Sequence, residues 1–117
     1  MDILDLVKSL LAYDTLAARQ WLADAERAGF ALSDVPPPRG IGPTESSLAA
    51  GVTELLAARS GQPVPAWTAR IPAVPERIFL VRAAATMPRL RALCEREGPE
   101  PLRRRGFLAP PEFLTVA

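Results

Sequence analysis

The sequence contains no histidine and a single cysteine, Cys94, among its 117 residues. Histidine is the commonest general base and the commonest protein ligand for transition metals, so its absence excludes most familiar catalytic and metal sites. Cys94 has neither a second cysteine for a disulfide nor a histidine for a nucleophilic pair. A lone thiol is typical of a reducing compartment. We therefore interpret Cys94 as a small buried apolar residue.

Long apolar runs are also missing. No stretch of the chain approaches the roughly 20 residues that cross a membrane. The N-terminal segment carries Asp2 and Asp5, whereas a signal peptide begins with basic residues. These two observations predict a cytoplasmic protein that does not act at a membrane.

The charge is nearly balanced over the whole chain, at +1, but it is unevenly distributed. Residues 1–60 carry five basic and eight acidic side chains, and residues 61–117 carry nine and five, so the halves have net charges of −3 and +4. A domain that binds nucleic acid usually has a clear basic excess, because neutralised phosphates supply much of its affinity. The balance therefore argues against nucleic acid, while the basic half indicates an acidic partner.

Helical periodicity dominates the part of the chain that is not rich in proline. Apolar side chains recur at helical spacing in segments 2–12, 15–28 and 45–59. Asp14 and Thr44 are suitable N-caps for the second and third helices, and Gly29 and Gly61 are suitable C-terminal stops. The same pattern makes Trp21 a core anchor.

The second half contains most of the thirteen prolines, about twice the average share of roughly 5%. We predict helices over 75–85 and 87–97, followed by a segment rich in proline and arginine at 99–117, where a short edge strand at 107–108 is an alternative. The whole chain, 1–117, is thus expected to form a single, mostly α domain of about five helices with Pro-rich connections. The sequence leaves the oligomeric state open.

Carboxylates are the remaining candidates for chemistry, and their spacing does not favour it. Asp24 and Glu26 are two residues apart, as are Glu95 and Glu97, so neither pair shares a helix face. Glu54 stands alone on its helix. We interpret all of them as solvated, and we predict a protein with no catalytic residue, no cofactor and no metal ligand.

Three consecutive arginines, Arg103, Arg104 and Arg105, are the sharpest polar feature. Adjacent positions cannot all face the core, so the run is either a solvated turn or a docking patch for carboxylates or phosphates, which guanidinium groups recognise well. Three aromatic side chains, Trp67, Phe107 and Phe113, belong either to the core or to the same interface. The candidate partner-binding residues are therefore Trp67, Arg103, Arg104, Arg105, Phe107 and Phe113.

Residues 62–117 show an ordered series of motifs: PVPAW at 63–67, LRAL at 90–93 and RRRGF at 103–107. This series resembles a group of small bacterial helical proteins that are often encoded beside nucleotidyltransferase-like proteins, although Pro-Leu precedes the arginine run here where the group has Phe. The resemblance implies a toxin–antitoxin pair in which this chain is the antitoxin. It further implies that Trp67 and the 103–107 segment are the signature, and that the basic half covers an acidic, metal-binding cleft of the toxin.

Two other functions remain open at the level of sequence. One is a structural adaptor or accessory subunit of another, unrelated complex. The other is a DNA-binding regulator, but the 15–28 and 45–59 helices are separated by far more than the 3–4 residues of a helix-turn-helix.

Overall fold

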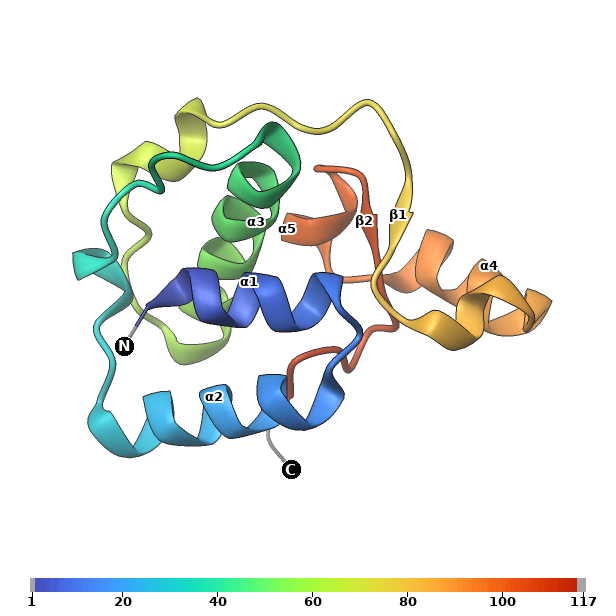
Figure 1. Ribbon diagram of the computed structural model, residues 1–117, viewed down its shortest axis with the longest axis horizontal. Coiled ribbons are helices and arrows are strands. Elements are labelled where there is room, and N and C mark those ends of the chain that lie inside the picture. Colours follow the sequence, from blue (N-terminus) through green and yellow to red (C-terminus); the bar gives the residue numbers. More distant parts are fainter. Residues whose placement is uncertain (1, 116–117) are drawn as a thin grey trace.

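The central helix of the fold is α3, around which the other elements are arranged (Figure 1). The computed structural model describes residues 2–115. Over these residues the chain is mostly helical, with five α-helices, three 3₁₀ turns and one pair of very short strands. In chain order the elements are α1 (Ile3–Leu11), α2 (Thr15–Ala28), η1 (Leu32–Asp34), α3 (Pro43–Ser60), η2 (Ala66–Arg70), β1 (Ile78–Phe79), η3 (Arg82–Ala85), α4 (Pro88–Glu97), α5 (Glu100–Arg103) and β2 (Phe107–Leu108).

The middle turns of α3 carry mostly small and apolar side chains on every side of the helix, which allows other elements to pack around it. Every residue from Ser47 to Leu55 is buried, so this helix has no solvent face over its middle turns. It contacts α1, α5, η1 and η2. Gly51 allows α5 to approach closely, because a Cβ there would lie 3.0 Å from Cδ2 of Leu102 and 3.1 Å from the carbonyl oxygen of Pro101.

All three helices predicted in the first sixty residues are present, and α1 and α2 have the single apolar face that their periodicity predicts, whereas α3 does not. The Asp14 carboxylate accepts a hydrogen bond from the amide N–H of Ala17 at 3.0 Å, and Gly29 and Gly61 end their helices in the left-handed conformation. The prediction of Thr44 as the cap of α3 is wrong. This helix begins at Pro43, and Gly42 is its N-cap. Proline is tolerated at the first helical position because an N–H there would have no acceptor within the helix.

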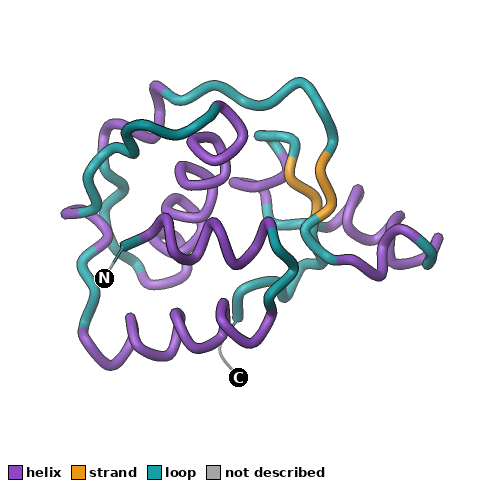
Figure 2. The backbone as a smooth tube through the Cα atoms, in the orientation of Figure 1, coloured by secondary structure: helices purple, strands orange, loops and turns teal. Residues whose placement is uncertain are grey.

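The predicted helix over 75–85 is also wrong. Residues 78–79 form β1, which pairs in parallel with β2, and 82–85 form the 3₁₀ turn η3 (Figure 2). The amide N–H groups of Ile78 and Leu80 donate to the carbonyl oxygens of Gly106 and Leu108, both at 2.8 Å. Because these backbone groups bond a segment far along the chain, they do not form a local helix, and the edge strand at 107–108 is confirmed.

Both tryptophans are core anchors that also fix a neighbouring backbone segment. The indole N–H of Trp21 donates to the carbonyl oxygen of Asp2 at 2.9 Å, which ties α2 to the start of α1. The indole N–H of Trp67 donates to the carbonyl oxygen of Val35 at 2.7 Å, which ties η2 to the proline-rich loop before α3. Cys94 is fully buried on α4, as predicted, and burial raises the pKa of its thiol.

Candidate partner-binding surface

The last residue of the arginine run forms a buried ion pair that joins the C-terminal segment to α3. Arg105 follows α5, and its Nε and Nη2 atoms donate to the two carboxylate oxygens of Glu54 at 3.0 and 3.1 Å. Two further N–H groups, on Nη1 and Nη2, donate to the carbonyl oxygens of Ile71 and Thr68 at 2.6 and 2.7 Å. The guanidinium thus joins α3, η2 and the chain after α5 in one bidentate arrangement.

The interpretation of Glu54 as a solvated carboxylate is wrong. Its side chain is only 9% exposed, and Arg104 approaches it as well, at 3.0 Å. Burial raises the pKa of the Glu54 carboxyl, but hydrogen bonds from Arg105 and Arg104 and their positive charges outweigh burial and leave the pKa below its ordinary value. Glu54 is therefore an ionised, buried partner for the arginine run.

The three arginines differ sharply in accessibility. The side chain of Arg105 is 7% exposed and that of Arg104 is 52% exposed. Arg103 is half-buried, where it pairs with Glu100 at 2.8 Å and donates to the carbonyl oxygen of Arg96. Arg105 consequently holds the fold together, whereas Arg103 and Arg104 reach the surface beside α4.

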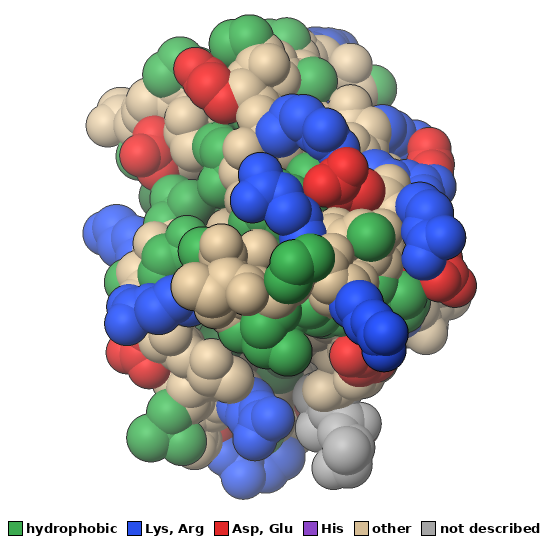
Figure 3. Space-filling view, turned by 90° about the vertical axis from the view of Figure 1, so that its right-hand side faces the viewer, with side chains coloured by type: hydrophobic (Ala, Val, Ile, Leu, Met, Phe, Trp, Pro, Cys, Tyr) green, Lys and Arg blue, Asp and Glu red, His purple; other side chains and the backbone are tan. Residues whose placement is uncertain are grey.

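Exposed arginines continue from this point along α4. Residues 77–104 carry seven arginines and three glutamates, a net charge of +4. We define the basic surface as Arg77, Arg89, Arg91, Arg96, Arg103 and Arg104. Figure 3 faces this end of the molecule and shows basic side chains around an apolar patch.

A glutamate on α4 neutralises part of the charge of the basic surface. Glu95 pairs with Arg77 at 3.1 Å and with Arg91 at 3.7 Å, and the guanidinium of Arg91 lies over the ring of Phe79. Among the residues that the structure describes, Arg89 and Arg96 have no carboxylate within ion-pair distance. These two side chains are therefore free to meet charge on another molecule.

The three aromatic candidates also differ in their accessibility. Trp67 and Phe107 are buried in the core, so neither presents its ring to a partner while the domain is folded. Phe113 is half-buried in the C-terminal segment and packs against the core from outside. Of the six candidate residues, only Arg103 and Arg104 come together on the surface, with Phe113 accessible elsewhere.

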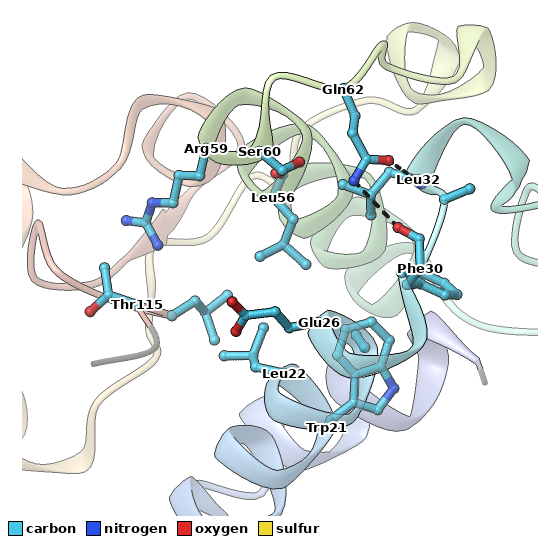
Figure 4. Close-up of a pocket in the computed structure, with 14 residues that line it drawn as sticks. Trp21, Leu22, Glu26, Phe30, Leu32, Leu56, Arg59, Ser60, Gln62 and Thr115 are labelled. Carbon is cyan, nitrogen blue, oxygen red and sulfur yellow. Dashed lines mark hydrogen bonds between the residues drawn. The ribbon is translucent and has the colours of Figure 1, made fainter.

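A pocket of about 630 Å³ lies between α2 and the end of α3, and no motif in the sequence predicts it. In Figure 4 the rings of Trp21 and Phe30 and the side chains of Leu22 and Leu56 line it, with Glu26 and Arg59 at its edge. The Gln62 side chain closes one corner of the pocket. Its Oε1 accepts a hydrogen bond from the backbone N–H of Leu32 at 2.9 Å, and its Nε2 donates to the carbonyl oxygen of Phe30 at 3.3 Å.

Over residues 2–115, no group of three or more Asp, Glu, Cys or His side chains is placed to hold a metal ion. In the same range, no helix is both long enough and apolar enough to span a membrane. A scan against protein-family models gave no match, and searches of curated proteins and of solved structures gave no significant match.

Proposed function

We propose that this protein is a non-enzymatic protein-binding subunit, an antitoxin that binds and neutralises a nucleotidyltransferase-like toxin. The observation that supports this most directly is the gathering of exposed arginines over α4 and α5 in a chain whose net charge is only +1. A charge concentrated on one surface steers association with an oppositely charged one.

The partner's chemistry matches this surface. A nucleotidyltransferase-like enzyme holds its metal ions through carboxylates, so its cleft is negatively charged when the metal is absent. Guanidinium groups form bidentate bonds to carboxylates, and arginine is enriched in protein interfaces. Arg89, Arg96 and Arg104 are the accessible donors that would cover such a cleft.

The test is co-expression with the product of the neighbouring gene. Each protein is induced alone and both are induced together, and growth and affinity co-purification are measured. The proposal expects growth arrest by the neighbour alone, rescue by this chain and co-elution of the two. A neighbour that is harmless, or that is not retained by this chain, would contradict it and leave the adaptor function in its place.

A further inference from the structure

Helix α4 lies at one end of the molecule, outside its main hydrophobic core. Figure 1 shows it beyond β1 and β2, and η3 is the element against which it mainly packs. Of its ten residues, Cys94 alone is buried. In the described part of the chain, the core around α3 includes no residue of α4, although this helix contains Leu90 and Leu93. The outer side of α4 is therefore open to contact with another molecule.

One row of side chains along α4 has an apolar centre between two positive charges. Positions i, i+3, i+4 and i+7 share one face of an α-helix. On α4 such a row has an exposed arginine at each end and two half-buried apolar side chains between them, and we define it as the docking row: Arg89, Ala92, Leu93 and Arg96. Because an α-helix rises about 1.5 Å per residue, the two arginines lie about 10 Å apart along its axis.

The charge of the docking row is not compensated within the described chain. Arg89 and Arg96 are exposed, and no carboxylate of these residues lies within ion-pair distance of either guanidinium. Of the two glutamates on α4, Glu95 pairs with two other arginines and Glu97 lies outside the row. A partner surface that complements this row therefore has a carboxylate near each of its ends.

The apolar centre distinguishes the docking row from a purely solvated basic face. Ala92 and Leu93 are half-buried and lie outside the main core, so they contribute little to the packing of the domain. The distance at which a helix packs against another surface depends on the side chains at the contact, and alanine allows a close approach. An apolar centre with a polar rim that includes arginine is the usual composition of a protein interface.

We propose that α4 docks through this row into an apolar groove of the protein partner, with a carboxylate of the groove beside each arginine. Insertion of one helix face into an apolar groove is a common mode of recognition between proteins. This inference rests on the proposed function, because the partner is the proposed toxin. It adds a requirement for close apolar contact, which attraction between charges alone does not make.

The substitution Ala92→Gln tests the apolar contact without changing the charge of the row. Glutamine is a good helix former, so α4 is retained, but its longer, polar side chain would hold the two surfaces apart. The matched control is Ala23→Gln, because Ala23 is also a half-buried alanine within a helix, on α2. The probe is the purified product of the neighbouring gene, and the association and dissociation rates are measured in low and in high salt.

We expect Ala92→Gln to weaken binding at least about tenfold, mainly through faster dissociation and by a similar factor in low and high salt. An effect through charge would instead lower the association rate and diminish in high salt. For Ala23→Gln we expect a change in affinity of less than about twofold, because that side chain lies outside the contact.

Equal affinities for the native chain and a folded Ala92→Gln chain would overturn this inference and leave the antitoxin proposal intact. A product that does not bind the native chain would contradict both. If Ala92→Gln does not fold, Leu93→Ala removes the larger apolar side chain of the row and is measured in the same way. If these variants lost binding to phosphatidylglycerol vesicles, or self-association, while binding to the product was unchanged, the row would belong to a membrane contact or to a second copy, and the inference would be wrong.

Discussion

The pairing of Glu54 with Arg105 joins two residues far apart in the chain and determines which arginines are accessible. Glu54 is the only charged residue between Ser46 and Ala58, in a stretch of small and apolar side chains. An isolated charge in such a run signals a buried, paired carboxylate, because an unpaired one would be costly. The identity of its partner could not be predicted, since nothing local relates position 54 to position 105.

Replacing Glu54 tests this pair. Glu54→Gln leaves the buried guanidinium of Arg105 without a counter-charge, and we expect the free energy of unfolding to fall by about 3 kcal/mol at pH 7. Urea denaturation measures the change. The exposed Glu97→Gln on α4 removes the same charge and should change stability by less than about 0.5 kcal/mol.

The loss of stability caused by Glu54→Gln should depend on pH. Because the folded pKa of Glu54 lies below its ordinary value of 4.5, its stabilising contribution is fully present above pH 4.5 and is lost as the pH falls through the lowered pKa. The stability difference between the native chain and Glu54→Gln should therefore shrink in acid. A difference that stayed constant from pH 7 to pH 3 would show that the carboxylate charge does not act as described.

At the scale of elements, local patterns predicted what local forces determine. The apolar stripes and aspartate caps of α1 and α2, and the glycines that end α2 and α3, are short-range features, and so these helices were predictable to within a few residues. The 78–79 strand was not, because its hydrogen bonds go to Gly106 and Leu108. The glycine at position 106 is the residue that indicates this strand pairing. Its φ of 94° and its close contact with the backbone of Glu76 leave no room for a side chain.

A substitution at Gly106 tests the importance of this strand pair. In Gly106→Ala, the new Cβ would lie 2.7 Å from the carbonyl oxygen of Glu76, so the two backbones must separate. We expect a loss of at least about 2 kcal/mol in stability, together with faster hydrogen exchange of the Ile78 and Leu80 amides. Gly40→Ala is the matched control, because Gly40 also has a positive φ but no neighbour within 4 Å, and it should cost only about 1 kcal/mol.

At the scale of the whole molecule, a helical body carries the basic surface at the end formed by α4 (Figure 1). The charge asymmetry and the arginine run are visible in the sequence itself. It could not predict that Arg105 turns inward and that Arg89 and Arg96 remain unpaired among the described residues, because those outcomes depend on how α3, α4 and α5 pack. The basic surface is therefore a product of tertiary structure rather than of the RRRGF motif alone.

The central claim is that this surface binds the acidic partner, and charge reversal tests it most directly. The affinity of the purified product of the neighbouring gene is measured for the double variant Arg89→Glu with Arg96→Glu. The control is the double variant Arg39→Glu with Arg70→Glu, which has the same change in charge but lies outside the basic surface. We expect at least about a tenfold loss of affinity for the first pair, mainly in the association rate and smaller at high salt, and less than about twofold for the control. Equal affinities for the two folded double variants would contradict the account.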